Sequence, residues 1–320
     1  METRSSGSRI HRLEFDVEWP PGHVVCYLVD GPEPILVDAA IPQQSGALAA
    51  ALSERGHALE GIEHVLITHP HIDHIGCVAD VLDAAEPTVH APASVLERFE
   101  QDPEQLGERV RRNCIEAGFA GDDLETAVGM AVQSLERNAK LLPVEAVDDP
   151  IRPGETRAIG DLSIDAVHLP GHQADHLSYV ADIDGERILL AGDMGIQPFR
   201  PVLLHDGLDD GYPEAFDAFY TALDRMTALD VDRVYPGHGP IHDDLETTVD
   251  RDRSSLDARL DRVHGLVADG HEIAPAVADA LAGTHNVNYL IPETMSALAH
   301  LEAIGRLETR RTDGVRRYIA

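Results

Sequence analysis

Four side chains of the kinds that bind metal ions fall within six residues of this sequence, directly after a short apolar run. They are His69, His71, Asp73 and His74. Residues 63–67 are rich in apolar and β-branched residues, which predicts a buried strand that delivers the four side chains in the loop at its carboxyl end. A lone histidine is usually a surface or core residue, but imidazole and carboxylate groups this close together favour a site for zinc, iron or manganese. Two of them can converge on one ion while the other two point toward a second position, so the spacing allows a pair of metals.

The segment His69-Pro70-His71-Ile72-Asp73-His74 has the H-x-H-x-D-H pattern and resembles the metallo-β-lactamase superfamily of hydrolases. Other segments similar to that family follow in its order over roughly residues 13 to 245: a strand-end Asp38, Pro170-Gly171-His172, Gly192-Asp193 and Gly237-His238. The resemblance implies that His69, His71 and His172 hold one metal, that Asp73, His74 and His238 hold a second, and that Asp193 bridges them. It also implies that Asp38 acts behind the ligands and that His176 supports its loop through hydrogen bonds.

The order of expected elements defines the fold class. Alternating strands and helices predict α/β layering, and the resemblance implies a four-layer αβ/βα catalytic domain over residues 1–245. A helical insertion at about 93–142 interrupts the alternation. It contains three expected helices, at Ala93–Glu100, Pro103–Ala117 and Asp122–Lys140. The insertion either serves packing or borders the mouth of the active site, where the resemblance implies that it helps to select the substrate.

Residues 246–320 have a different character. A long charged helix at Asp243–Asp269 precedes helices at Glu272–Ala282 and Pro292–Ile304 and a hairpin built from Arg306–Thr309 and Val315–Ile319. This helix, helix and hairpin order is similar to a winged-helix domain. Five arginines, at 306, 310, 311, 316 and 317, make the hairpin locally basic. They could hold a phosphate-bearing substrate or nucleic acid, but pairing with the acidic body of the protein is the favoured interpretation.

The net charge is the unusual feature of the composition. Asp and Glu outnumber Lys and Arg by 57 to 25, which gives a formal charge of −32, and Lys140 is the only lysine. Such a balance argues against nucleic acid or an anionic membrane as a general partner, and it is typical of halophilic cytoplasmic proteins. No apolar run is long enough to cross a bilayer. The first seven residues lack the apolar segment of a signal peptide, and Cys26, Cys77 and Cys114 have no disulfide or zinc-finger spacing, so we expect a cytoplasmic location.

These features predict a metal-dependent hydrolase that acts on a small-molecule substrate. Two divalent ions, zinc in the first place with iron or manganese as alternatives, would make a nucleophilic hydroxide from water near neutral pH, and Asp73 is expected to orient it. The resemblance implies glyoxalase-II-like hydrolysis of a thioester, ester or lactone as the first candidate reaction. Alternatives are a phosphodiesterase or ribonuclease that uses the winged helix, and a DNA-binding regulator with a vestigial metal site. Substrate choice is expected to lie with the insertion and residues 195–210, where Phe199, Arg200 and His205 are candidates, and the oligomeric state is left open.

Overall fold

The computed structural model describes residues 8–282 and 290–320, so the N-terminal residues on which the signal-peptide expectation rests lie outside it. The first of its two large sheets has six strands. In spatial order they are β1 (Ile10–Asp16), β2 (His23–Val29), β3 (Ile35–Val37), β4 (His64–Leu66), β5 (Thr88–Pro92) and β6 (Asp149–Ile151). β1, β2 and β3 are antiparallel neighbours, whereas β3 to β6 pair in parallel. The parallel strands therefore bring their carboxyl ends to one edge of the sheet.

The second large sheet has five strands. In spatial order they are β11 (Arg233–Pro236), β10 (Glu186–Gly192), β9 (Leu177–Ile183), β8 (Leu162–His168) and β7 (Thr156–Ile159). Neighbouring strands are antiparallel except for β10 and β11, which run in parallel. Hence the loops that follow β10 and β11 leave the sheet at the same end.

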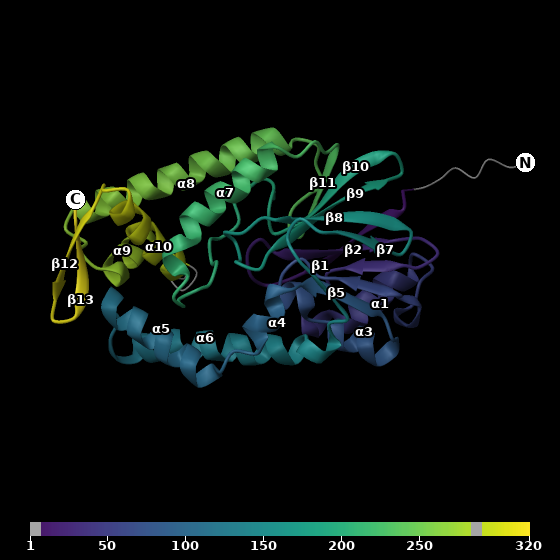
Figure 1. Ribbon diagram of the computed structural model, residues 1–320, viewed down its shortest axis with the longest axis horizontal. Coiled ribbons are helices and arrows are strands. Elements are labelled where there is room, and N and C mark those ends of the chain that lie inside the picture. The colour runs from purple at the N-terminus through teal and green to yellow at the C-terminus, as the bar shows by residue number, and fades with distance from the viewer. Residues whose placement is uncertain (1–7, 283–289) are drawn as a thin grey trace, which may run out of the picture.

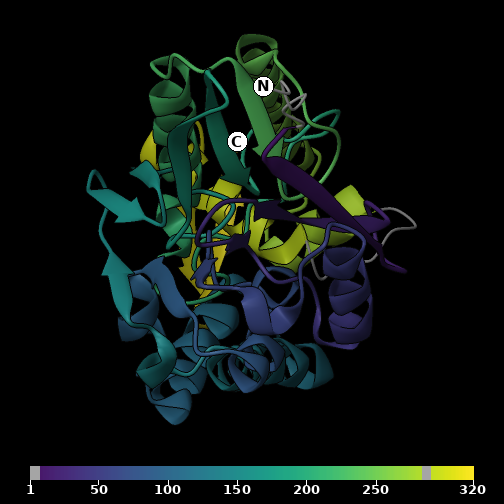
Figure 2. The same ribbon diagram turned by 90° about the vertical axis from the view of Figure 1, so that its right-hand side faces the viewer.

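The two sheets stack face to face, and helices cover their outer faces (Figures 1 and 2). Alternate residues of both sheets, such as Tyr27, Leu66 and Tyr179, form the core between them. α1 (Ser45–Ser53) and α3 (Val78–Ala84) pack on the outside of the first sheet. α7 (Ala215–Thr227) and α8 (Leu245–Ala268) pack on the outside of the second sheet. The order helix, sheet, sheet, helix confirms the four-layer α/β fold.

Short helices complete these layers. The segment that follows the histidine motif is divided into α2 (Ile72–Ile75) and α3, and α2 carries part of that motif. Single 3₁₀ turns connect other elements: η1 (Pro42–Gln44), η2 (Leu59–Gly61), η3 (Val144–Ala146) and η4 (Tyr212–Glu214). No helix in residues 8–282 and 290–320 is both long enough and apolar enough to cross a membrane.

The helical insertion runs along the bottom of the molecule in Figure 1. Its helices are α4 (Ser94–Phe99), α5 (Pro103–Ala117) and α6 (Gly121–Leu141), which confirms the three helices expected there. Asp102 caps α5 by accepting a hydrogen bond from the backbone N–H of Glu104 at 2.8 Å, and Gly118 ends the helix with a φ of 102°. The buried side chains of Leu106, Val110 and Cys114 recur at helical spacing and hold α5 in the core.

α7 was not expected from the sequence, although its signal was present. Phe216, Phe219, Leu223 and Met226 repeat every three or four residues and are all fully buried. This apolar stripe packs in the same core as Val180 and Leu189 of the second sheet. It thereby supplies the outer layer on that side of the molecule.

The C-terminal elements follow the expected order. α9 (Ala274–Ala282), α10 (Leu290–Ala303) and the hairpin of β12 (Glu308–Thr312) and β13 (Val315–Ile319) come after α8. The winged-helix identification and a domain boundary at residue 245 remain predictions.

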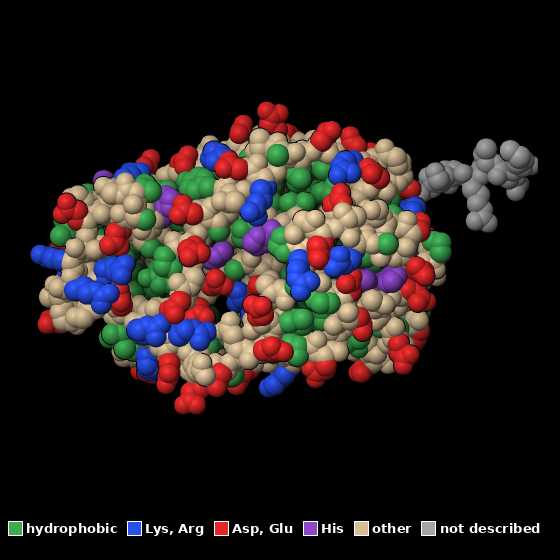
Figure 3. All heavy atoms as spheres, viewed as in Figure 1, with side chains coloured by type: hydrophobic (Ala, Val, Ile, Leu, Met, Phe, Trp, Pro, Cys, Tyr) green, Lys and Arg blue, Asp and Glu red, His purple; other side chains and the backbone are tan. Residues whose placement is uncertain are grey.

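The basic character of the hairpin is neutralised locally. Acidic side chains are spread over the face shown in Figure 3, and arginines gather over the hairpin and the neighbouring α5. Arg311 and Arg316 pair with Glu116, and Arg310 and Arg317 pair with Glu272. These ion pairs agree with the interpretation that the arginines bind the acidic body of the protein.

Candidate metal centre

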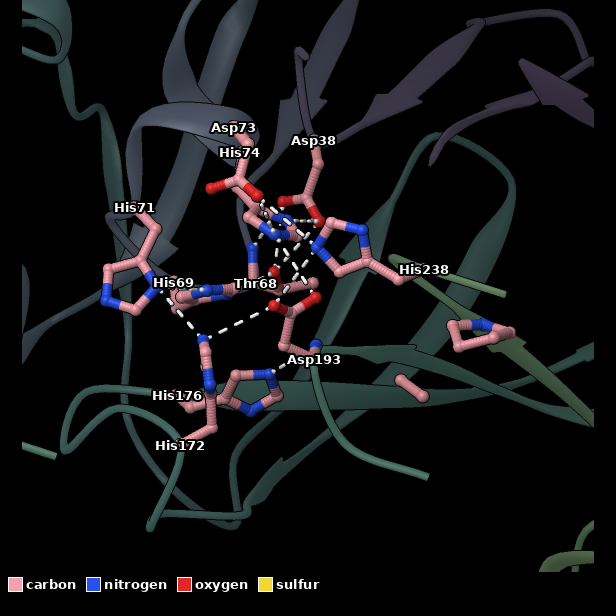
Figure 4. Close-up of polar contacts among 12 residues, drawn as sticks. Asp38, Thr68, His69, His71, Asp73, His74, His172, His176, Asp193 and His238 are labelled. Atoms are coloured by element: carbon pink, nitrogen blue, oxygen red, sulfur yellow. Dashed lines mark hydrogen bonds and ion pairs between the residues drawn. The ribbon is translucent and has the colours of Figure 1, made fainter. Parts of the chain in front are cut away.

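Seven side chains that the sequence singled out meet at one end of the two sheets (Figure 4). Each side chain belongs to a residue that follows the carboxyl end of a strand, either in the loop there or in the first turn of the next helix. His69 and His71 lie after β4, Asp73 and His74 in the first turn of α2, His172 after β8, Asp193 after β10 and His238 after β11. Because the loops of both sheets converge there, residues far apart in the chain form one cluster.

The first group contains only histidines. The Nε2 atom of His69 lies 3.0 Å from Nδ1 of His71, and Nε2 of His172 lies 3.0 Å from the same atom. Three ring nitrogens therefore point at a common position. Three converging imidazoles are a donor set that suits zinc and other divalent transition metals.

The second group combines two carboxylates with two imidazoles. Nε2 of His238 lies 3.3 Å from Oδ2 of Asp73 and 3.3 Å from Oδ2 of Asp193, while Nε2 of His74 lies 3.2 Å from the other oxygen of Asp193. Asp193 also touches the first group, because its Oδ2 lies 3.3 Å from Nε2 of His172. The carboxylate of Asp193 thus stands between the two groups.

Hydrogen bonds behind the cluster orient the histidine rings. Nδ1 of His172 donates to the carbonyl oxygen of Val202 at 2.9 Å, and Nδ1 of His238 donates to that of His23 at 2.8 Å. A carbonyl oxygen can only accept, so each Nδ1 carries a proton and each Nε2 is the nitrogen that faces the cluster. His176 acts differently, since its Nε2 accepts a bond of 3.0 Å from the backbone N–H of Asp193. It supports the loop, as the sequence suggested.

Asp38 and Thr68 form a second supporting pair. Asp38 is buried at the end of β3, where its carboxylate accepts hydrogen bonds from Nδ1 of His74 at 2.8 Å and from the backbone N–H of Thr68 at 2.9 Å. The Thr68 hydroxyl donates to the same carboxylate at 2.9 Å and lies 3.0 Å from Nδ1 of His69. Sequence reasoning found Asp38 but missed Thr68, for which its place immediately before His69 was the available signal.

The first group is electrically neutral. Burial lowers the pKa of His69 far below its usual value, and it lowers the pKa of His71 to about 3. Burial also lowers the pKa of His172. These imidazoles are therefore neutral, and the neutral ring is the form that binds a metal.

The second group is highly charged. Burial opposes a proton on His74 and His238, but neighbouring carboxylates outweigh it, so the pKa of His74 stands well above its usual value and that of His238 rises to about 10. Burial alone would raise the pKa of Asp73, yet His74 and His238 lower it to about 2. A divalent cation would replace those two protons and satisfy the same carboxylates. Nε2 of His74 and Oδ1 of Asp193 are buried and, although they lie 3.2 Å apart, neither forms a hydrogen bond within the described residues, which fits a donor set meant for a metal.

Close approach of the backbone explains two glycines here. A Cβ atom on Gly237 would lie 2.6 Å from Oδ1 of Asp193 and 2.7 Å from Cε1 of His74. A Cβ atom on Gly192, whose φ is 54°, would lie 2.6 Å from Nε2 of His176. Glycine is therefore required at both positions to bring the strand ends against the cluster.

Comparison with known proteins agrees with this geometry. The family model described as "Metallo-beta-lactamase superfamily" matches residues 19–238, which include all seven clustered side chains. The chain belongs to this superfamily.

Relatives within the superfamily include hydrolases. The chain is 25% identical to a hydroxyacylglutathione hydrolase of Rhodopseudomonas palustris over 252 residues, covering 78% of this chain and 76% of that protein. It is 26% identical to a thioesterase of Emericella nidulans over 245 residues, covering 76% of this chain and 53% of the thioesterase. These relatives and the family match show that the protein is a hydrolase with a metal-binding cluster.

Solved structures show how much of the fold is shared. A metallo-beta-lactamase family protein of Thermus thermophilus superposes with a TM-score of 0.78 at 23% identity and covers 97% of this chain and 98% of its own. A beta-lactamase domain protein of Burkholderia ambifaria gives a TM-score of 0.75 at 18% identity, with 98% and 92% covered. The shared architecture therefore extends beyond the catalytic layers to the insertion and the C-terminal elements.

A cavity of about 1090 Å³ opens over the metal centre of this superfamily member. Its lining includes His71, Asp73 and His238 and the three residues proposed for substrate contact, Phe199, Arg200 and His205. The Arg200 guanidinium is already engaged, because it donates to the buried carboxylate of Glu293 at 2.8 Å. Arg137 of the insertion, which the sequence did not single out, lines the cavity as well.

Proposed function

We propose that this protein is a binuclear metal-dependent hydrolase that cleaves a thioester, ester or lactone with water. In this proposal His69, His71 and His172 hold one metal, Asp73, His74 and His238 hold the other, and Asp193 bridges them. The observation that carries the proposal is the position of Asp193, whose two oxygens face one histidine of the first group and two of the second at 3.2–3.3 Å.

The cofactors would be two divalent ions, with zinc as the first candidate and iron or manganese as alternatives. When bound, such ions supply Lewis acidity and a hydroxide nucleophile near neutral pH. The chain's own residues hold and orient the reactants. Asp73 is ionised because of its lowered pKa, so it can accept a hydrogen bond from the attacking water and direct its lone pair toward the acyl carbon. The walls of the cavity would position the substrate carbonyl and limit the access of bulk water.

Two observations favour a small acyl substrate over a nucleic acid. The hairpin arginines that could contact phosphates are paired with Glu116, Glu272 and Glu302. The two relatives described above are named a hydroxyacylglutathione hydrolase and a thioesterase. We therefore rank phosphodiester cleavage second and a DNA-binding regulator with a vestigial site third.

A substrate panel tests the proposal. Protein stripped of metal by chelation in high salt should be inactive, and reloading with zinc, manganese or iron should restore hydrolysis of acyl thioesters, esters or lactones. Activity on phosphodiesters alone would move the assignment to the second candidate. Full activity in protein shown by elemental analysis to contain no metal would refute the proposal.

The bridging role has its own test. Asp193→Ala should reduce both the bound metal and the rate, because it removes the shared negative charge between two cations. Asp83→Ala, which changes an exposed aspartate of α3, is the matched control and should keep both. Two metals per chain in a folded Asp193→Ala variant would show that Asp193 is not the bridge.

A further inference from the structure

One face of α6 lines the cavity over most of the helix. The contributing residues are Asp123, Thr126, Ala127, Met130, Ala131, Gln133, Ser134, Leu135, Arg137 and Asn138. From the first to the last, the face spans about 22 Å at 1.5 Å per residue. Its far C-terminal residue is tied to the metal centre, because the Asn138 amide donates at 2.8 Å to the carbonyl oxygen of Pro70, between His69 and His71. The wall therefore starts at the metal centre and leads away from it.

The character of this wall changes with distance from the centre. The side chains at the metal end are mostly polar, those of Gln133, Ser134, Arg137 and Asn138 with Leu135 among them, whereas Ala127, Met130 and Ala131, with Thr126 beside them, form a mostly apolar middle. The Met130 side chain is 49% exposed, and Val202, which lines the same cavity beside His172, is 38% exposed. Large apolar side chains that remain exposed inside a cavity mark a surface for an apolar ligand.

The opposite wall comes from the C-terminal elements. Pro275 and Ala278 of α9 and Ile291 and Pro292 of α10 line the same cavity. The turn between α5 and α6 reaches these elements, because a Cβ atom on Gly118 would lie 3.3 Å from side-chain atoms of both Ile273 and Val315. The insertion and the C-terminal elements thus form the two sides of one channel.

The charges along the channel differ between its ends. At the metal end, Arg137 bonds only to the neutral groups of Asn138 and Ser134, and within the described residues it forms no ion pair with a carboxylate. The other two arginines of the lining, Arg98 and Arg200, are paired with carboxylates. Asp123 lies toward the end of α6 that is distant from the centre. A ligand with a polar or anionic head and an apolar tail would therefore place its head beside the metal centre.

We propose that this channel binds the apolar acyl chain of the substrate, so that the enzyme cleaves thioesters or esters of medium-length to long fatty acids. The inference rests on the proposed function and adds the substrate class. In the reaction, the oxygen of water forms a bond to the acyl carbon and the C–S or C–O bond breaks. The leaving sulfur or oxygen takes up a proton from the water, so the products are a fatty acid and a thiol or alcohol. The head lies among the polar residues of the metal end, and the chain extends along Ala127, Met130 and Ala131.

A chain-length series measures the predicted preference. Metal-loaded protein in high salt is assayed with acetyl, hexanoyl and decanoyl thioesters of one small thiol. Burial of each methylene contributes up to about fourfold in kcat/KM, so kcat/KM should rise by at least about a hundredfold from acetyl to decanoyl. A flat or falling series would overturn the inference.

A pair of matched variants locates the effect. Met130→Glu places a charge in the apolar wall and should lower the decanoyl to acetyl ratio of kcat/KM at least tenfold. Ile115→Glu changes a residue of α5 that is similarly exposed, at 46%, but does not line the cavity, and it should keep the ratio of the parent. Both variants are confirmed as folded by thermal unfolding. An unchanged ratio in Met130→Glu would overturn the placement of the chain.

A binding measurement separates this inference from the proposed function. Decanoate should displace a fluorescent fatty acid from the metal-free protein, and should do so at least tenfold more weakly from Met130→Glu. If decanoate binds in this way but no ester or thioester is cleaved, the channel is supported and the proposed function is refuted. If short thioesters are cleaved while decanoate neither binds nor is preferred as an acyl group, the function stands and the channel is refuted.

Discussion

Replacing Asp38 by asparagine should selectively weaken the second metal site. Asparagine matches aspartate in shape and tolerates the φ of 58° found at this position, so the fold should persist. The backbone N–H of Thr68 can only donate, so the amide oxygen must remain on it at 2.9 Å. The amide NH₂ then faces Nδ1 of His74 at 2.8 Å, where two donors would meet. The ring of His74 can then carry a proton only on Nε2, the nitrogen that faces Asp193.

The expected loss follows from that change of tautomer. Removing a partner that orients a metal-bound histidine costs about 10- to 100-fold in affinity, or about 1.4 to 2.7 kcal/mol. Calorimetric titration of the metal-free protein with zinc should show one site unchanged, the three-histidine group, and a second site weakened by that factor. Asp182→Asn on β9 makes the same charge change at an exposed position and serves as the control. Two sites of parental affinity in a folded Asp38→Asn variant would refute the tautomer argument.

Three further predictions concern charge. The chain has a formal charge of −32 and one lysine, so its acidic side chains repel one another at low salt. The unfolding midpoint should rise from low to molar potassium chloride, because the distance over which charges act falls from about 30 Å at 0.01 M to about 3 Å at 1 M. A flat or falling midpoint would contradict the halophilic interpretation. Burial raises the pKa of Asp252 to about 6, so the folded protein is most stable while this carboxyl is protonated, below its unfolded pKa, and loses that stability as pH rises through 6. Asp252→Asn should therefore raise the free energy of unfolding in urea by roughly 2 kcal/mol at pH 8 and by little at pH 4. Equal effects at both pH values would exclude this cause. Changing Arg310, Arg311, Arg316 and Arg317 together to glutamine should lower the free energy of unfolding by at most about 1 kcal/mol per ion pair. It should leave hydrolysis of a small thioester or ester within a few-fold of the parent. Lost activity in the folded variant would show that the arginines contact substrate.

The sequence predicted best those features that depend on local pattern. A buried strand followed by clustered histidines predicts both the strand and the loop at its end, and the same logic places Asp193 and His238 after their strands. The apolar stripe of α7 was equally local and could have been recognised from Phe216, Phe219 and Leu223.

The remaining features depend on tertiary packing. Asn138 bonds to Pro70 across 68 positions, and Glu293 pairs with Arg200 across 93. Neither partner has a pattern that identifies the other, because a hydrogen bond between distant segments leaves no periodic signal. The channel is of this kind too, since its walls belong to α6 on one side and to α9 and α10 on the other.

The bond from Asn138 to Pro70 also bears on how such enzymes diversify. An insertion that merely covered the active site could be exchanged between relatives to give new substrate ranges while the chemistry stayed intact. Here the helix that forms the wall of the channel also braces the loop between two histidines of the centre. Mutations that remodel the wall near this end of α6 will therefore also disturb catalysis, and evolution toward other substrates is easiest at Ala127 and Met130, more than a full helical turn away.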